Sequence, residues 1–226
     1  MVVRNFNQSR CRYINQRKKL KQLWVFDLDD TLHHASPHIF EFINRDMTQY
    51  ISENLSISHE KANCLRTDYW KKYGSTLRGL MIHHQIDPHD FLLKTHNLKD
   101  IEEKIEPVKN LRMILKSING DKIILTNAPT HYAKFILKKL DIHYFFKQII
   151  CIEDNSFISK PDIRIFRKIK RMPYQKIILI DDSHENLKSA YHAGLDTVHI
   201  SNERINKNYA SKKLHGLGEL LKLKRF

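Results

Sequence analysis

Cysteine is scarce in this sequence of 226 residues, and its three copies stand apart from one another. Cys11, Cys64 and Cys151 form no C-x-x-C pair, which argues against a zinc site or a disulfide framework. No run of apolar residues approaches the roughly 18 that a membrane-spanning helix needs. Residues 1–22 lack the apolar centre of a signal peptide, although their arginines leave a transit peptide open. These absences predict a soluble, cytoplasmic protein that does not enter membranes.

Short motifs of several enzyme classes are also missing. The sequence contains no glycine-rich nucleotide loop and no serine-centred elbow. The adjacent pairs His33-His34 and His83-His84 cannot act as the i, i+4 ligands of a zinc-binding helix. Any chemistry of this chain is therefore expected from its acids, hydroxyls and lysines.

The formal charge of +14 is concentrated at the two ends of the chain. Residues 1–22 hold seven Lys and Arg and no acid, and residues 201–226 hold seven against two acids, so residues 23–200 carry only +2. We expect a basic N-terminal tail over 1–22 and a basic C-terminal segment over 202–226. Leucines spaced over 214–223 predict a docking helix in that segment. Nucleic-acid binding through these ends is an open alternative.

Apolar segments of strand length alternate with helical patterns in residues 23–32 and 107–201. The expected strands cover residues 23–28, 122–125, 148–152, 177–180 and 197–200, and the expected helices 108–118, 130–140, 161–171 and 184–193. Such alternation builds a doubly wound parallel sheet of the α/β class, with helices on both faces. Ligands of such sheets lie outside the carboxyl ends of the strands.

Residues 33–106 interrupt this alternation. They contain only helical patterns, near 37–54, 58–73 and 88–96, and they are too many for a simple crossover. We expect an inserted α-helical cap that folds over the strand ends. Arg78, between two glycines, could be presented to a ligand by this cap. Its plainer interpretation is a surface arginine paired with a nearby acid.

Acids directly follow the first expected strand, in the run Asp27-Leu28-Asp29-Asp30-Thr31. Carboxylates spaced in this way suit a hard divalent cation with oxygen ligands. A carboxylate beside Mg²⁺ can attack phosphorus while a second one delivers and removes the proton. The run could also be an acidic turn that caps a helix.

Polar groups at other strand ends favour the catalytic interpretation. Thr126 offers a hydroxyl, and Pro129 stands where a helix would begin whose N–H groups could hold a phosphate. Lys160 supplies a positive charge for a phosphoryl group, and Asp181 and Asp182 complete an oxygen-rich metal site. Four such groups in this order are hard to explain as caps and loop residues alone.

The same positions resemble the signature of the haloacid dehalogenase (HAD) superfamily of aspartyl-phosphate enzymes, over residues 23–200. The matching residues are Asp27 to Thr31, Thr126, Lys160-Pro161, and Asp181-Asp182-Ser183 with Asn186. Within this resemblance, residues 73–80, 84–88 and 125–128 look like the pyrimidine 5′-nucleotidase branch.

The resemblance implies a role for each residue that contacts the substrate. Asp27 would be the nucleophile, and Asp29 the general acid and base. Thr126 and Lys160 would bind the phosphoryl group, and Asn127 would also bind the substrate, while Arg78 remains the candidate contact from the cap.

The resemblance also implies the residues around the metal. Mg²⁺ would be held by Asp27, by Asp182 and by the backbone carbonyl of Asp29. Asp181 would orient Lys160 or a bound water. Asn186 stands where many relatives carry a second acid, so it would act in the outer shell.

Asp29 bears on the type of reaction. Dehalogenases of the superfamily lack an acid there, because a halide leaves without a proton, whereas an alkoxide leaving from phosphorus needs one. We therefore expect a Mg²⁺-dependent phosphohydrolase that forms an aspartyl-phosphate and acts on nucleoside 5′-monophosphates, first of all pyrimidine ones. The alternatives are a sugar-phosphate or phosphoglycolate phosphatase, or a phosphomutase, of the same fold.

Overall fold

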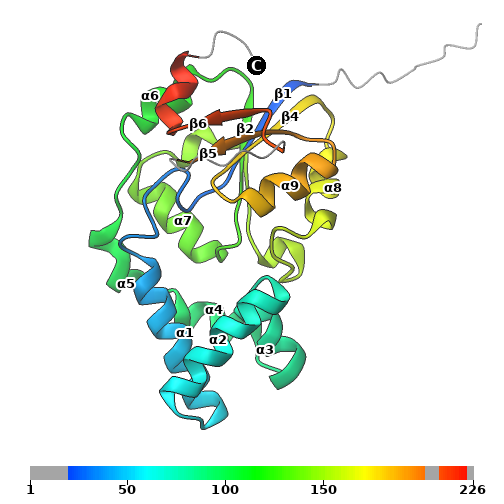
Figure 1. Cartoon of the computed structure of the whole chain (residues 1–226). Coiled ribbons are helices and arrows are strands. Elements are labelled where there is room, and N and C mark those ends of the chain that lie inside the picture. Colours follow the sequence, from blue (N-terminus) through cyan, green and yellow to red (C-terminus); the bar gives the residue numbers. More distant parts are fainter. Residues whose placement is uncertain (1–19, 202–208, 223–226) are drawn as a thin grey trace, which may run out of the picture.

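The computed structural model describes residues 20–201 and 209–222. A central parallel sheet has helices on both of its faces, and a second group of helices lies beyond one end of the sheet (Figure 1). The strand order in the described residues is β3-β2-β1-β4-β5-β6. The bounds are β1 Leu20–Phe26, β2 Asp121–Leu125, β3 Gln148–Ile150, β4 Tyr174–Asp181, β5 Asp196–Ile200 and β6 Lys212–Leu214. The doubly wound α/β class is thereby confirmed.

Side chains of β1 alternate between the two faces of the sheet, as the period of a strand requires. Leu23 and Val25 pack with α8 (Ile163–Lys170) and α9 (His184–His192) in one buried cluster. Trp24 and Phe26 face the opposite side, where α6 (Leu111–Ser117) and α7 (Thr130–Lys139) form the larger cluster. Because both faces are covered, β1 is apolar throughout its buried length.

The chain between β1 and β2 is helical. Its helices are α1 Phe40–Leu55, α2 His59–Tyr73, α3 Thr76–His84, α4 Pro88–Thr95 and α5 Leu98–Ile101, followed by the 3-10 helix η1 Glu102–Lys104. Helices α1 to α4 share a buried cluster that includes Tyr50, Leu80 and Phe91, and Ile152 from the sheet side joins it, whereas Ile101 of α5 packs in the larger core cluster of the sheet region. The helices therefore have a core of their own that also contacts the sheet region.

Helix α3 was not expected from the sequence, and local chemistry explains it. Gly74 ends α2 in the left-handed region, with φ of 79°. Ser75 then begins α3, because its hydroxyl accepts a hydrogen bond from the backbone N–H of Arg78 at 3.2 Å. Gly79 lets the ring of Tyr69 lie where a Cβ would stand.

The two segments that connect the sheet region to the inserted helices run side by side. His33 forms an isolated bridge with Pro107, and the His34 N–H donates to the Glu106 carbonyl at 2.9 Å. Val108 donates in turn to the carbonyl of Leu32 at 3.1 Å. The expected boundaries at 33 and 106 fall at this pairing. That residues 33–106 act as a cap stays a prediction.

Both ends of the chain differ from expectation. Strand β1 begins at Leu20, which pairs with Tyr174, so residues 20–22 lie in the sheet and not in a tail. The described part of the expected helix over 214–223, residues 214–222, forms no α-helix: Leu214 ends β6 and the 3-10 helix η4 covers Leu217–Lys222. Gly216 and Gly218 disfavour an α-helix here.

The leucines of this C-terminal segment, Leu214, Leu217 and Leu220, nevertheless join the larger core cluster. Leu223 and the basic residues of 1–19, 202–208 and 223–226 lie outside the described residues. Across the described ranges, no helix combines the length and apolar character that a membrane span requires.

The docked segment generates a stability prediction. Leu217 is 1% exposed and Leu221 is 42% exposed, on the same short helix. Leu217→Ala should lower the free energy of unfolding by about 2–5 kcal/mol, because it opens a cavity in the core. The matched control Leu221→Ala should change it by less than about 0.5 kcal/mol. Urea unfolding measures both, and equal effects would show that the segment is not packed as described.

Candidate active site

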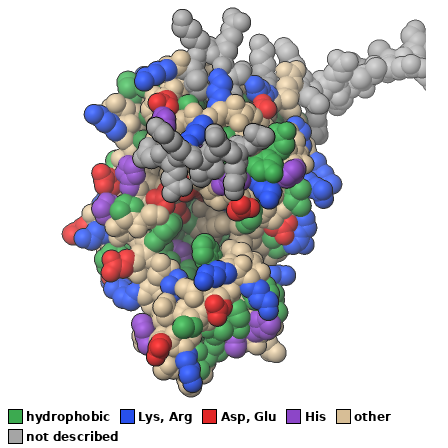
Figure 2. Space-filling model, in the orientation of Figure 1, with side chains coloured by type: hydrophobic (Ala, Val, Ile, Leu, Met, Phe, Trp, Pro, Cys, Tyr) green, Lys and Arg blue, Asp and Glu red, His purple; other side chains and the backbone are tan. Residues whose placement is uncertain are grey.

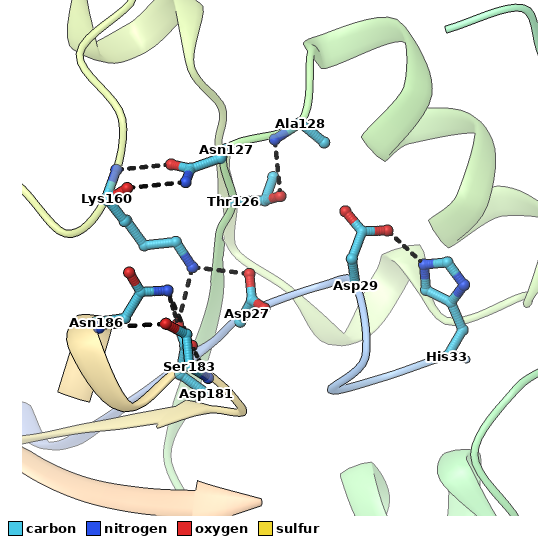
Figure 3. Close-up of polar contacts among 10 residues, drawn as sticks. All are labelled: Asp27, Asp29, His33, Thr126, Asn127, Ala128, Lys160, Asp181, Ser183 and Asn186. Atoms are coloured by element: carbon cyan, nitrogen blue, oxygen red, sulfur yellow. Dashed lines mark hydrogen bonds and ion pairs between the residues drawn. The ribbon is translucent and has the colours of Figure 1, made fainter. Parts of the chain in front are cut away.

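The expected site residues converge at the carboxyl ends of three neighbouring strands. Asp27 follows β1, Thr126 follows β2, and Asp181 ends β4 (Figure 3). Strand β1 pairs with β2 on one side and with β4 on the other. The chain crosses over β1 after β3, so the strand order reverses at this point and leaves a crevice for a ligand.

Lys160 lies at the centre of this group. Its ammonium donates to Asp27 Oδ1 at 2.7 Å and to Asp181 Oδ2 at 2.9 Å, with the side chain only 2% exposed. Burial alone would lower the pKa of Lys160, but the charges of Asp181 and Asp27 raise it above its ordinary value. The lysine therefore stays positively charged in an enclosed site.

Asn127 fixes the loop that carries Lys160. Its Oδ1 accepts from the Lys160 backbone N–H at 2.7 Å, and its Nδ2 donates to the Lys160 carbonyl at 3.1 Å. The oxygen and the nitrogen of the Asn127 side-chain amide are thus both engaged in hydrogen bonds to Lys160. The geometry supports a positioning role for Asn127, and its predicted contact with the substrate stays a prediction.

Asp181 contacts Lys160 and is itself held by protein donors. The resemblance implied that it would orient Lys160 or a bound water. Its Oδ1 accepts from the backbone N–H of Ser183 at 2.8 Å, and Asn186 Nδ2 donates to both carboxylate oxygens at 3.0 and 3.1 Å. Asn186 lies in the first turn of α9 and is 8% exposed. Both oxygens of Asp181 are therefore engaged by protein donors, and Asn186 acts through Asp181.

Three carboxylates gather around the single ammonium. Asp27, Asp181 and Asp182 each offer an oxygen, and these oxygens lie within 4.8 Å of one another. Burial raises the pKa of Asp27 well above its ordinary value; Lys160 opposes this shift, and Asp181 and Asp182 add to it. Burial, and next the charge of Asp181, raise the pKa of Asp182 to about 7.

This donor set fits a hard cation. Three ionised carboxylates and one ammonium leave an excess of negative charge in a buried place, and carboxylate oxygens are the ligands that Mg²⁺ prefers. Because the oxygens of Asp181 are occupied, Asp27 and Asp182 are the carboxylates best placed to coordinate. The predicted ligand role of the Asp29 carbonyl stays a prediction.

Asp29 lies apart from this group, with its carboxylate turned toward His33 (Figure 3). Its Oδ1 accepts from the Tyr132 hydroxyl at 2.7 Å and contacts His33 Nε2 at 2.9 Å. Neither residue was expected in the site from the sequence. The four-residue spacing of His33 from Asp29 was an available signal, whereas Tyr132 lies 103 residues away and left none.

Other predicted phosphate-binding groups are partly occupied. The Thr126 hydroxyl oxygen accepts from the N–H of Ala128 at 3.0 Å, which leaves its own proton free to donate. The N–H of Thr130, at the start of α7, donates to Glu153 Oε1 at 2.9 Å. The start of α7 therefore offers fewer free N–H groups to a phosphate than the sequence suggested. Asp30 accepts from Ala35 and Ser36 and shapes the loop after β1.

Arg78 lines a cavity of about 300 Å³ between the inserted helices and the loop of Lys160. The lining residues are Tyr73, Gly74, Arg78, Ile158, Ser159, Pro161, Asp162 and Arg164. Ser159 and Pro161 flank Lys160 in the sequence, so both neighbours of this lysine line the cavity. Asp162 is held mainly by Arg164, which lowers the pKa of this carboxyl, and Arg78 contributes less. Arg78 is thus near both a cavity and an acid.

The molecule is hollowed between the sheet region and the inserted helices (Figure 2). In that view, Asp and Glu side chains lie on the sheet side of the hollow and Lys and Arg side chains on the helix side.

Known proteins resemble this chain in sequence and in fold. A family model of haloacid dehalogenase-like hydrolases matches residues 24–200. Phosphate metabolism protein 8 of Saccharomyces cerevisiae is 25% identical over 197 residues, 79% of this chain and 61% of that protein. The chain thus spans about three fifths of the length of this relative.

Solved structures share the fold at low identity. An HAD phosphatase from Thermococcus onnurineus has a TM-score of 0.64 and 20% identity, over 89% of this chain and 96% of that one. A Bacillus subtilis protein described as an HAD hydrolase, bound to magnesium, has a TM-score of 0.59 and 20% identity, over 91% and 98%. A Thermotoga maritima protein described as a β-phosphoglucomutase has a TM-score of 0.57 and 17% identity, over 89% and 97%.

The family match over residues 24–200 includes all the residues that meet in this site: Asp27, Thr126, Lys160, Asp181 and Asp182. This chain belongs to the haloacid dehalogenase-like hydrolase family.

Proposed function

We propose that this protein is a Mg²⁺-dependent phosphomonoester hydrolase that uses Asp27 as its nucleophile and acts on nucleoside 5′-monophosphates. One observation carries the proposal: the buried carboxylate of Asp27 lies 2.7 Å from Lys160 and beside the carboxylate of Asp182. A hydrolase family and a fold shared with an HAD phosphatase support it.

The chemistry proceeds in two steps. A carboxylate oxygen of Asp27 attacks phosphorus, while Lys160 and the Thr126 hydroxyl hold phosphoryl oxygens and Asp29 gives a proton to the departing alkoxide. Asp29 then takes a proton from water, which attacks the phosphorus of the aspartyl-phosphate and releases inorganic phosphate. Mg²⁺, held by Asp27 and Asp182, would neutralise charge on the phosphoryl oxygens.

Substrate choice is assigned to the inserted helices, which we propose act as a cap. The strand ends supply groups for the phosphoryl moiety alone, so the rest of the substrate must meet other residues. The cavity beside Lys160 offers the aromatic ring of Tyr73 and the guanidinium of Arg78. A ring and a cation suit a nucleobase and its carbonyl oxygens, in agreement with the resemblance to pyrimidine 5′-nucleotidases.

A sugar-phosphate substrate is the second candidate, since a β-phosphoglucomutase shares the fold. Phosphate release from equal concentrations of nucleotides, sugar phosphates and phosphoglycolate, with and without Mg²⁺, separates the two. We expect Mg²⁺-dependent release with nucleoside 5′-monophosphates as the best substrates. A preference for sugar phosphates would support the second candidate, and no release from any of them would refute the hydrolase proposal.

The nucleophile can be removed without changing the shape of the site. Asp27→Asn should lower kcat by at least about 10³-fold, since it deletes the attacking oxygen. The fold should survive, because the substitution also removes a buried acid whose pKa is raised. The control Asp141→Asn, at an exposed position with φ of 52° that Asn tolerates, should keep full activity. Retention of most activity by Asp27→Asn would refute the mechanism.

Removing the charge of Asp182 should have opposite effects: it should stabilise the metal-free protein and weaken cation binding. Because the pKa of Asp182 is about 7 in the folded protein, against roughly 4 in the unfolded chain, the cost of its ionised form builds up between these two pH values and is fully present above about pH 7. Without metal, Asp182→Asn should raise the free energy of unfolding by roughly 1–3 kcal/mol at about pH 8 and by much less at about pH 4.5.

The same variant should lose most of the rise in Tm that Mg²⁺ gives the unmodified protein. Thermal melts at both pH values, with EDTA or with Mg²⁺, measure the two effects. An unchanged response to Mg²⁺ would exclude Asp182 as a ligand.

Loss of the Arg78 side chain should raise KM for one kind of substrate far more than for another. Arg78→Ala should raise KM about tenfold for a nucleoside 5′-monophosphate and less than about twofold for p-nitrophenyl phosphate. The exposed Arg112→Ala serves as a matched control with no expected effect on either substrate. Equal losses on both substrates would place Arg78 in a structural role or at the phosphoryl site.

A further inference from the structure

We propose that Tyr132 and His33 are positioning residues that lock the carboxylate of Asp29, so that its Oδ2 is the oxygen that exchanges a proton with the leaving group. This inference rests on the proposed function, in which Asp29 is the general acid. It assigns a task to two buried side chains that the chemistry described above does not use.

Both contacts end on the same oxygen of Asp29. The Tyr132 hydroxyl donates to Oδ1 at 2.7 Å, and His33 Nε2 lies 2.9 Å from Oδ1. In the described part of the chain, Oδ2 makes no hydrogen bond with a protein group. The Asp29 side chain is 17% exposed, so the free oxygen has room to meet a substrate. An oxygen with two donors is a poor place for a proton, which leaves Oδ2 to carry it.

Tyr132 is held rigidly enough to act as an anchor. It lies in α7 and is 0% exposed, and its ring packs edge-on against His96 with centroids 5.6 Å apart. Burial, and next the charge of Asp29, raise the pKa of the Tyr132 hydroxyl well above its ordinary value. At neutral pH the hydroxyl therefore stays protonated and donates to Asp29.

His33 has its hydrogen-bonding partner in Asp29 alone, among the residues that the structure describes. The residue is 0% exposed, and its other ring nitrogen, Nδ1, is buried without a partner. An ionised carboxylate only accepts, so Nε2 carries the hydrogen in this contact. A buried imidazole that leaves one nitrogen unsatisfied is costly as a purely structural element. Its backbone pairs with both Asp29 and Pro107, which fixes the ring beside the carboxylate.

The anchors convert a freely rotating carboxyl group into one with a defined direction. Rotation about the last side-chain bond of Asp would exchange the two oxygens and move the proton away from the substrate. Holding a reacting group within a narrow range of orientations contributes directly to the rate. Loss of an anchor should therefore harm proton transfer and spare the steps that need no proton.

A comparison of leaving groups isolates that step. For each variant, kcat/KM is measured for an alkyl phosphate, a nucleoside 5′-monophosphate, and for p-nitrophenyl phosphate, whose leaving group departs without a proton. The value of kcat/KM reports events up to loss of the leaving group. Tyr132→Phe and His33→Leu should each lower the alkyl-to-aryl ratio about tenfold, part of the loss expected for Asp29→Asn. His33→Gln, which can keep an N–H donor at this position, should restore most of the ratio.

Two controls separate positioning from structural damage. The exposed residues Tyr144 and His34 supply matched variants, Tyr144→Phe and His34→Leu, which should leave the ratio unchanged. In the Asp29→Asn background, adding Tyr132→Phe should change the ratio by less than about twofold, because a residue that acts through Asp29 has nothing left to position. Thermal melts accompany each variant, and the isosteric Tyr132→Phe keeps the test decisive if His33→Leu does not fold.

The outcomes are distinguishable. No phosphate release by the unmodified protein from either substrate would refute the proposed function itself. A ratio that falls for Asp29→Asn but not for Tyr132→Phe would leave the proposed function standing and refute the positioning role. A further fall of the ratio when Tyr132→Phe is added to Asp29→Asn would also refute it, since Tyr132 would then act independently of Asp29.

Discussion

The ammonium of Lys160, buried between Asp27 and Asp181, is the interaction on which the site depends. One positive charge inside a group of three carboxylates stabilises them only in part, as the raised pKa of Asp182 shows. Removing Lys160 itself would leave these carboxylates buried without a compensating charge and would be strongly destabilising. The surrounding structure therefore holds the lysine from several sides: Asn127 fixes its backbone, and Asn186 fixes Asp181.

The same excess of negative charge links fold and chemistry. A buried acidic site is unfavourable without a cation, and it becomes favourable when a divalent ion and a phosphoryl group share it with the lysine. The sheet makes this arrangement possible, because β1 and β4 are paired along most of their length and end together. The carboxylate of Asp29 does not belong to this buried acidic group, since Tyr132 and His33 hold it outside.

The sequence predicted those features that depend on local patterns. Buried strands of the sheet were visible as short apolar runs, and their polar ends placed Asp27, Thr126, Lys160 and Asp181 in one crevice. The contact of Asp181 with Lys160 followed from the resemblance to the HAD superfamily. The features that could not be predicted from the sequence depend on contacts between distant residues or on exceptions to a local pattern. Tyr132 looks like any apolar residue of a helix face, and the glycines near Leu217 turned an expected α-helix into a 3-10 helix.

The central claim is that Asp27 becomes phosphorylated, and chemical trapping tests it most directly. Protein mixed with substrate and Mg²⁺ is quenched in the first turnovers and treated with borohydride, which reduces an acyl phosphate to an alcohol. Peptide mass spectrometry then locates the reduced residue. The account predicts homoserine at position 27, dependent on substrate and absent from the Asp27→Asn variant. Reduction at a different acid, or turnover with no trapped residue under any quench time, would contradict it.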